Sequence, residues 1–464
     1  MRPLLLACVA IVAAVPAASA QDGPTRCNAI NTDSTREIDL KTPTGQYNAF
    51  FGGGIVVVCP SKKIHLKADS AEEYGDDRRF YLVGHVFYED PRFSVHSDFL
   101  NYFMPEERIV ATGNVDATMP SGSKLKGPMA TYLRPIPKTR PQPEMTAVGR
   151  PTITLIQHDS AGRLAPPMDV TADRIFTRGD SASNSVVNAG GSVLIVRQDL
   201  TAHSDSMFLD GQRNVLHLIG NPKINGTKGD NPFTLVGTLL DLYSSNQKLN
   251  RVLARGQAVA TSKDLTLRSD TIDFRVSDDV LERAMAWGST TRAAARSPTD
   301  SMLADSIDVI MPHQRAREIH AIGHAYAESK PDTVKFHTKQ MDWMRGDTIL
   351  AMFDTIPSKD TTQAPRIKSL IAIDSAKAFY NMAARDTTLC VPAISYSTGR
   401  RIIVSFGTKG VEHVDVIGRT IGVLSEPNDS IPENRCPKPP PKKDGKTPPT
   451  PPDTLITILP PSRR

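Results

Sequence analysis

Apolar and polar residues alternate along most of the chain, in short segments that carry a glycine near the middle. Residues 109–115 show the pattern: Ile109, Ala111, Gly113 and Val115 stand at every second position, with mostly polar residues between them. Side chains on a β strand point alternately to opposite faces, so residues two apart share a face. The pattern therefore predicts strands. Helical periodicity is almost absent after residue 20, so residues 339–353 also fit a strand better than a short helix.

These glycine segments recur at roughly 30 to 40 residues, which is the spacing of a structural repeat. Each is usually preceded by a segment built around Ala-Asp or Ser-Asp, so one repeat is two short strands joined by turn-forming residues. The glycine segments centre on Gly84, Gly113, Gly149, Gly190 or Gly191, Gly220, Gly256, Gly288 and Gly323, with weaker copies at Asp374 and Gly418. The aspartates of the partner segments are Asp69, Asp98, Asp173, Asp205, Asp270 and Asp305.

One face of the predicted strands is apolar and small, and the other tolerates charged residues such as Arg255 and His320. The glycines share the apolar face, where a missing side chain leaves room or permits a bend. A closely packed sandwich whose glycines only mark bulges has the same periodicity, so the pattern leaves both structures open. A register slip of one residue would turn every inward residue outward. The inward positions that we expect to line an apolar interior are Leu82, Val86, Ile109, Ala111, Val115, Leu216, Leu218, Val252, Ala254, Ile319 and Ala321.

The order of the motifs resembles the OstA-like (LptA-like) domain of periplasmic lipopolysaccharide-transport proteins. The resemblance is good over residues 63–133 and recognisable to about residue 425. It rests on Ala-Asp-Ser at 68–70, Gly-His-Val at 84–86, Ser-Asp at 97–98, Ala-Thr-Gly-Asn-Val at 111–115 and Thr-Tyr at 131–132. It implies an all-β, elongated, taco-like jellyroll of stacked hairpins in two facing sheets. In the family, an apolar groove between the sheets holds the acyl chains of lipid A.

The resemblance also implies binding partners, and boundaries and a length for the folded region. The ligand would be lipopolysaccharide or a related glycolipid. Open sheet edges would pair with similar jellyroll domains of other transport proteins or with a second copy of this chain. We expect two consecutive jellyroll segments, residues 63–165 and 166–425, and nine or ten hairpins stacked over about 45 Å. The outer-membrane member of the family carries a barrel after its similar domain, which we do not expect here because a proline-rich tail follows residue 425.

The ends of the chain suggest export. Residues 1–20 have the charged start, apolar core and small-residue end of a cleaved signal peptide, which places the protein in the periplasm, with association to the outer membrane as a further expectation. A lipoprotein anchor at Cys8 is the alternative. Residues 21–62 are expected to hold a polar, irregular segment up to residue 46, followed by a first strand at 55–58. Residues 437–464 are expected to form a disordered proline- and lysine-rich tail.

The charge distribution and the cysteine content constrain the possible binding partners and the disulfides. The net charge of +5 comes from Arg2 and from the tail, where six cations face two anions, so the body is neutral and nucleic acid is not expected as a partner. Four cysteines follow the signal peptide, and an even number in an oxidising compartment suggests disulfides. We pair Cys27 with Cys59 and Cys390 with Cys436. Free thiols and the other pairings remain alternatives.

Two other classes of function compete with lipid transport. A carbohydrate-active β-solenoid enzyme would need a unique pair of carboxylates, whereas the aspartates here recur once per repeat, which favours a structural role. The histidines, including His203, His320 and His324, lack metal-ligand spacing. We therefore expect no enzyme, no metal and no cofactor. A structural or adhesive surface fibre would tolerate the same repeats without needing an apolar groove.

Overall fold

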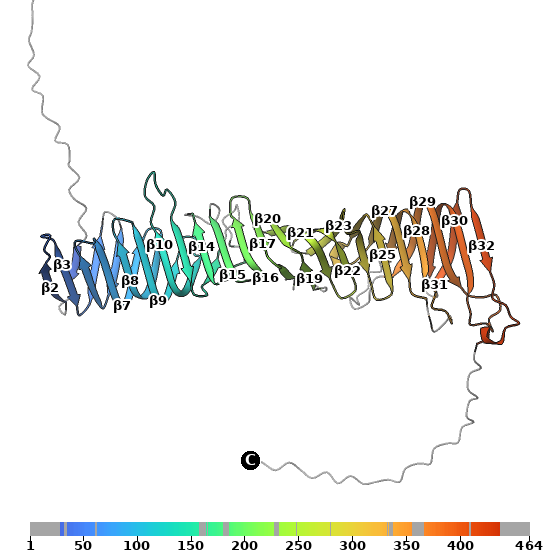
Figure 1. Cartoon of the computed structure of the whole chain (residues 1–464), viewed down its shortest axis with the longest axis horizontal. Helices are drawn as coiled ribbons and strands as arrows, with labels where there is room; N and C mark the ends of the chain where they lie inside the picture. The colour runs from blue at the N-terminus through green and yellow to red at the C-terminus, as the bar shows by residue number, and fades with distance from the viewer. Residues whose placement is uncertain are drawn as a thin grey trace, which may run out of the picture.

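The protein is an elongated, all-β stack, as the sequence predicts (Figure 1). The structure is a computed structural model that describes residues 28–31, 35–60, 63–156, 164, 166–179, 185–226, 232–246, 248–278, 280–331, 333, 337–354, 366–407 and 410–436. Within these ranges, the helical elements are the short 3-10 turns η2 (Pro312–Gln314) and η3 (Pro432–Asn434). A helix long and apolar enough to cross a membrane is absent from this part of the chain.

Antiparallel pairing builds two sheets that run along the whole stack. Twelve long strands belong to both sheets: β7 (Arg79–Asp90), β8 (Phe93–Phe103), β9 (Arg108–Thr118), β10 (Lys124–Leu133), β15 (Val186–Arg197), β16 (Leu200–Asp210), β21 (Lys248–Thr261), β22 (Thr266–Ser277), β27 (Glu318–Ser329), β28 (Asp342–Phe353), β29 (Ile367–Met382) and β30 (Ala393–Gly407).

Shorter strands belong to one sheet each. The first sheet adds β2 (Arg36–Lys41), β3 (Tyr47–Gly52), β6 (Ser70–Tyr74), β11 (Glu144–Val148), β14 (Arg174–Arg178), β17 (Val215–Ile219), β20 (Leu239–Ser245), β23 (Val280–Trp287), β26 (Ser306–Ile310) and β31 (Gly410–Ile417). The second sheet adds β1 (Asn28–Asn31), β4 (Ile55–Cys59), β5 (Ile64–Ala68), β12 (Thr152–Leu155), β13 (Met168–Thr171), β18 (Lys223–Gly226), β19 (Phe233–Val236), β24 (Ala293–Arg296), β25 (Asp300–Ala304) and β32 (Ile421–Ser425).

A bend in each long strand carries the chain from one sheet to the other. In β7 the pairing with β8 is interrupted between Val83 and Val86, and the two residues between them, Gly84 and His85, have φ of 76° and 43°. In β9 the pairing with β8 is interrupted in the same way, and Gly113 at this point also has a positive φ. Positive φ is the left-handed region, which glycine adopts without steric cost. The recurring glycines therefore mark the line along which the two sheets meet.

The recurring aspartates stand beside these bends. A Cβ atom added to Gly84 would overlap the carboxylate of Asp69 on the neighbouring strand. That carboxylate lies 2.7 Å from Nδ1 of His85, the second residue of the bend. The same overlap is found at Gly113 with Asp98, Gly191 with Asp173, Gly220 with Asp205, Gly288 with Asp270 and Gly323 with Asp305. The structure thus gives these aspartates the structural role expected from their recurrence, and it assigns the fourth bend to Gly191, not Gly190.

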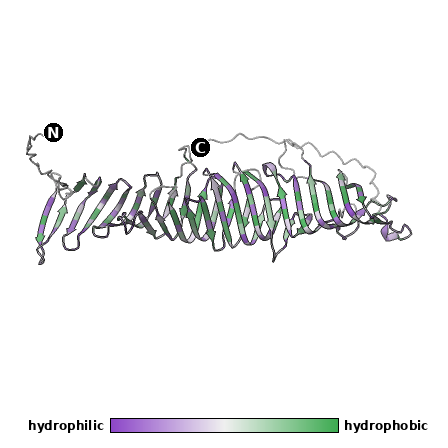
Figure 2. Ribbon diagram, turned by 90° about the horizontal axis from the view of Figure 1, so that it is seen from above, coloured by the Kyte–Doolittle hydropathy of each residue, from purple (hydrophilic) through white to green (hydrophobic). Residues whose placement is uncertain are grey.

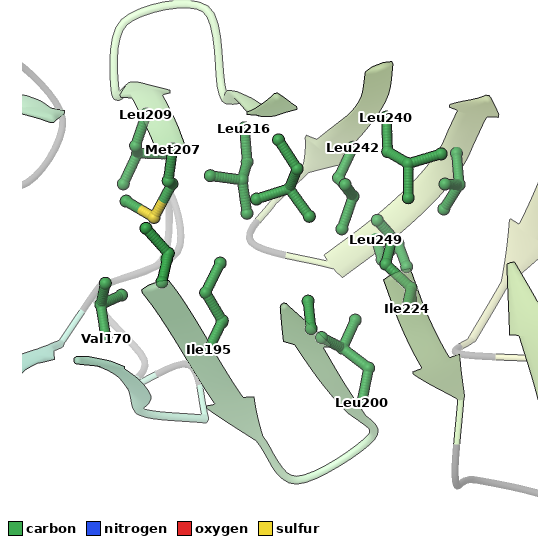
Figure 3. Close-up of a cluster of buried hydrophobic side chains, with 14 of the residues drawn as sticks. Val170, Ile195, Leu200, Met207, Leu209, Leu216, Ile224, Leu240, Leu242 and Leu249 are labelled. Atoms are coloured by element: carbon green, nitrogen blue, oxygen red, sulfur yellow. The ribbon is translucent and has the colours of Figure 1, made fainter. Parts of the chain in front are cut away.

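The hydrophobic core fills the space between the sheets. Burial alternates along each half of a long strand, as in β9, where Ile109, Ala111, Val115 and Ala117 are buried. Figure 2 shows the alternation as apolar and polar bands along the strands. In Figure 3, Leu209 and Leu216 of the first sheet and Ile195, Leu200 and Ile224 of the second sheet point toward one another.

Two expectations about the fold are wrong. Residues 21–46 were expected to be irregular, but β1 and β2 lie within them. All six residues of β2 are exposed because it is an edge strand that pairs with β3. Its sequence nevertheless alternates, with Ile38 and Leu40 between charged residues, so a signal for a strand was present. The stack is also about twice the expected ~45 Å, because each hairpin of long strands adds two strands to both sheets, at ~4.8 Å per strand.

The predicted division at residue 165 is bridged by hydrogen bonds. β11 pairs with β14, and β12 pairs with β13, so residues on both sides of it share the two ladders. The two-segment organisation stays a prediction. Figure 1 shows the strands continuing through this region without a break in direction.

The cysteines of the described region are oxidised. Cys390 and Cys436 form a disulfide with 4.8 Å between their Cα atoms, which ties the end of the described chain to the loop between β29 and β30. Cys59 is disulfide-bonded as well. Cys27, the partner expected for Cys59, lies outside the described residues, as do the predicted signal peptide and the tail.

Two adjacent glycines provide a test of the bend. Replacing Gly191 with Ala should lower the free energy of unfolding by about 2 kcal/mol, because its φ is 82° and the new Cβ would overlap Asp173. Replacing Gly190 with Ala should change it by less than about 0.5 kcal/mol, because the space around Gly190 is open. Urea denaturation of both variants checks this, and equal effects would contradict the assigned bend.

Candidate functional site

The candidate site is the apolar interior between the two sheets. The structure places all eleven predicted interior residues on inward faces, each at most 7% exposed. Nine of them lie in the first sheet, while Val86 and Val115 lie in the second. In the described structure they pack against other side chains and do not line an open channel. Their role in binding a lipid therefore stays a prediction, and a chain lying between them would require the sheets to move apart.

The architecture leaves one long margin of the stack free to open. Among the described strands, backbone pairing runs along each sheet, and the sheets meet at the bends. The opposite margin consists of two facing rows of turns. The first row contains residues 104–107 and 211–214 of the first sheet, and the second contains residues 91–92 and 119–123 of the second sheet. We use the term mouth for the opening between these rows.

A pocket of about 90 Å³ lies at the mouth. Its lining comes from both sides: Phe93, Met119 and Leu155 from the second sheet and its turns, and Met145 and Leu209 from the first. The side chain of Tyr132 also lines it, and the Tyr132 ring lies 4.3 Å from that of Phe93, centroid to centroid. This mouth pocket is continuous with the buried apolar interior, because Ile153 and Val187 belong to both.

Beside the mouth pocket, a buried ion pair links the two rows of turns. Arg134 follows β10 in the first sheet, and its Nε donates to Oδ2 of Asp90 at the end of β7 in the second sheet, at 3.0 Å. Its Nη1 donates to Glu107 at 2.7 Å and to the Tyr102 hydroxyl at 3.2 Å. The Asp90 side chain is 1% exposed and also accepts from the Tyr88 hydroxyl at 3.1 Å. We call this network the Arg134 clasp.

Arg134 keeps its charge despite burial. Burial works against the charge of Arg134, but Tyr88, Tyr102, Asp90 and Glu107 around it raise its pKa above the ordinary value. Burial, together with a hydrogen bond to Glu107, raises the pKa of Tyr102 to about 12. Burial raises the pKa of Tyr88 as well. Tyr88 and Tyr102 therefore stay protonated at neutral pH, and their hydroxyls donate to Asp90 and Glu107. The clasp is held by charge-assisted hydrogen bonds, which are stronger than neutral ones.

Other charged groups of the body stabilise the outer face of the first sheet. Asp241 is fully buried beneath His217, at 2.6 Å, and Arg255. Asp273 is held by Arg251 and Arg275, both at 2.9 Å. His320 faces outward and contacts Glu318 at 3.1 Å. Both of these buried carboxylates contact an arginine, which gives them a structural role on the sheet surface.

Sequence reasoning did not identify the pocket and the ion-pair network at the mouth. The eleven predicted residues come mainly from the first sheet and leave out Phe93, Tyr132 and Ile153, which line the mouth pocket. Periodicity places such residues inside but does not show that they lie at a margin. Arg134 was hidden within a proline-rich stretch, and its partner Asp90 lies 44 positions earlier. A tyrosine two positions before a buried acid, as in Tyr88 and Asp90, is a weak signal for such a network.

Comparisons with known proteins place few constraints on this chain. No model of a protein family matches it, and no curated protein matches its sequence. One solved structure with partial similarity is LptH, the LptA homologous periplasmic component of the lipopolysaccharide transport device from Pseudomonas aeruginosa. The two sequences are 16% identical, and the match covers 27% of this chain and 84% of LptH with a TM-score of 0.22. A similarity this slight carries no argument, so the class is defined by the chain itself: an elongated two-sheet β stack with an apolar interior.

The contribution of the clasp to stability is measurable. Replacing Arg134 with Met should lower the free energy of unfolding by about 3–5 kcal/mol, because it leaves the buried Asp90 carboxylate without its cation. Replacing Lys126 with Met is the matched control. It breaks an exposed 3.2 Å pair with Asp116 and should cost at most about 1 kcal/mol. Chemical denaturation compares the two, and similar small losses would show that the clasp is not a structural link.

Proposed function

We propose that this chain is a periplasmic lipopolysaccharide-binding carrier or bridge that holds the acyl chains of lipid A between its two sheets on the way to the outer membrane. The single observation that supports this most is a long apolar interior whose two walls are joined by backbone along one margin. Two further features agree with it. They are the ordered motifs that resemble the OstA-like family and the signal-peptide pattern of residues 1–20.

The energetics of such a site are favourable. Transfer of an acyl chain from water to an apolar environment contributes about 0.8 kcal/mol per methylene. Contacts between the two inner faces are lost when the sheets separate, but the acyl chain replaces them with contacts of the same kind. Hydrogen bonding within each sheet is unaffected, because the strands pair along the stack. Separation therefore exchanges one set of apolar contacts for another and leaves the β ladders intact.

The mouth is the natural route for a glycolipid with a large polar part. An amphiphile that enters sideways buries its acyl chains between the sheets while its sugars stay in water outside the two rows of turns. The Arg134 clasp spans the mouth near one end of the stack, so the sheets there cannot separate without breaking its ion pair with Asp90. Binding at this end would be coupled to rearrangement of the clasp.

The ends of the stack provide surfaces for partners. β2 at one end of the first sheet is wholly exposed, with Ile38 61% and Leu40 56% exposed. β32 at the other end of the second sheet exposes Ile421 and Val423. Edge strands offer unpaired backbone groups that can pair with another chain. We propose that these edges join similar jellyroll domains or further copies of this chain, so that neighbouring interiors become continuous.

A structural or adhesive fibre is the second candidate. The tight packing of the eleven predicted interior residues and the exposed edge strands favour it, because such a fibre needs lateral or end-to-end contacts but no internal ligand. It differs from a carrier in one measurable respect: lipopolysaccharide would have no access to inward side chains.

Site-specific photo-crosslinking in the periplasm separates the two candidates. A photoreactive residue at Ile319, which faces the interior, should form adducts with lipopolysaccharide. The same residue at the neighbouring position His320, which faces outward, should not. Adducts are detected by immunoblotting against both partners. If Ile319 and a second inward position, Ala111, are silent in folded protein, the carrier proposal fails and the fibre proposal is favoured.

End-to-end association can be tested at one edge. Replacing Ile421 and Val423 with Lys should reduce self-association, because lysine on an edge strand disfavours pairing with another edge. Both side chains are exposed, so the fold itself should be stable to the change. Sedimentation velocity at increasing concentration gives the readout, and Ile219→Lys, an exposed site in the middle of the stack, is the control. A wild-type chain that stays monomeric throughout would rule out this use of the edge.

A further inference from the structure

Tyr132 lines the mouth pocket, and its hydroxyl is a buried polar group without a hydrogen-bond partner among the described residues. The residue as a whole is 7% exposed. Buried polar groups nearly always have a partner, and an unmade hydrogen bond destabilises the folded state. Of the described buried side-chain groups without a partner, the Tyr132 hydroxyl is the one whose residue lines the mouth pocket, so a ligand that enters beside it could supply the missing partner.

The surroundings of Tyr132 combine apolar and charged groups. Ser123, which also lines the pocket, accepts hydrogen bonds from the backbone N–H of Ile156 at 3.0 Å and from the Ser121 hydroxyl at 3.0 Å. Phe93 stacks at an angle on the Tyr132 ring, and Met145 is the residue paired with Tyr132 on the neighbouring strand β11. Arg92 also lines the pocket, and the Arg134 clasp lies two residues along the chain. The pocket thus offers a narrow, mainly apolar space beside a hydroxyl that has no partner among the described residues.

We propose that the mouth pocket is the loading subsite for a single fatty-acyl chain, whose ester, amide or hydroxyl oxygen accepts a hydrogen bond from the Tyr132 hydroxyl. The inference rests on the proposed function and deepens it, because it specifies where the first acyl chain binds and which side chain recognises its polar end. Burial raises the pKa of Tyr132, so the hydroxyl keeps its proton and acts as a donor at neutral pH.

The size of the pocket fits a chain segment and not a whole lipid. At about 90 Å³ it is smaller than the ~150 Å³ cavity that accommodates a benzene ring, so only a few carbons fit before the sheets separate. Ile153 and Val187 connect the pocket to the interior, which gives the rest of the chain an apolar path between the sheets. Binding at Tyr132 would therefore start the separation that full loading requires.

The chain contains a matched control for this idea. The Tyr380 hydroxyl is also buried without a partner among the described residues, but Tyr380 lies in β29, far along the chain from the mouth pocket, and does not line it. Tyr132→Phe and Tyr380→Phe each remove one buried, unpaired hydroxyl and keep the ring. They differ in whether a ligand could have used that hydroxyl.

The experiment measures binding of N-lauroylglucosamine, an acyl chain joined by an amide to a sugar. Its dissociation constant is obtained from displacement of the fluorescent apolar probe 1-N-phenylnaphthylamine from the purified chain. Tyr132→Phe should raise the constant about fivefold, equivalent to ~1 kcal/mol at 1.4 kcal/mol per factor of ten. Tyr380→Phe should leave it unchanged. Leu155→Trp, which fills the pocket from a half-buried position, should abolish competition.

Each outcome decides between the proposals. If the wild-type chain binds both N-lauroylglucosamine and purified lipopolysaccharide but Tyr132→Phe binds as tightly as wild type, the subsite is overturned and the carrier function stands. If the Tyr132 dependence holds but lipopolysaccharide is not retained, the subsite stands and the lipopolysaccharide function fails. Binding of neither ligand by the folded wild-type chain overturns both. Equal gains in melting temperature for the two Phe variants, without a change in binding, would identify both hydroxyls as unsatisfied groups only.

Discussion

The bend between the two sheets is the constraint on which the rest of this structure depends. Every second long strand has two consecutive left-handed residues at one point, and at most of these bends an aspartate beside the bend occupies the space that a side chain would need. Glycine at the first position meets both demands at once, as at Gly84 beside Asp69. Because the same strands build both sheets, the bend also fixes their relative register. Asp374 shows that the demand is conformational, since it takes the bend with φ of 56° in a slot without glycine.

Because of the bend, different interactions stabilise the molecule along the stack and across its interior. Along the stack, strands are held by backbone hydrogen bonds in two ladders, and the exposed aspartates contact the second bend residue, as Asp98 does with Asn114 at 2.9 Å. Across the interior, the sheets are held by apolar contacts and, at the mouth, by the Arg134 clasp. Apolar contacts are non-directional and can be exchanged for those of an acyl chain. A stack built this way can resist lengthwise distortion and still separate along one margin.

The sequence was sufficient for the features that repeat and insufficient for those that occur once. Alternation around Gly113 predicts strands and identifies the inward side chains, because the same two-residue period recurs in every repeat. The same period is present in β2, where Ile38 and Leu40 alternate with charged residues, but in a segment too short and polar to stand out. The doubled length follows from sharing strands between sheets, which no local pattern reveals. The partners Arg134 and Asp90 come together only through the folded mouth. Tyr132 looks like any inward aromatic residue until the structure shows that its hydroxyl has no partner.

The interior mixes large and small inward residues along its whole length. Near the clasp, the rings of Tyr88 and Phe93 lie among alanines such as Ala111. Farther along, Phe274 and Tyr380 lie among alanines such as Ala286 and Ala372. Because protein interiors are close-packed, the rings of one wall must be accommodated by small residues around them, so no part of the interior is held open by its side chains alone. What distinguishes the clasp region is therefore the buried ion pair between Arg134 and Asp90, which must break before the sheets can separate there.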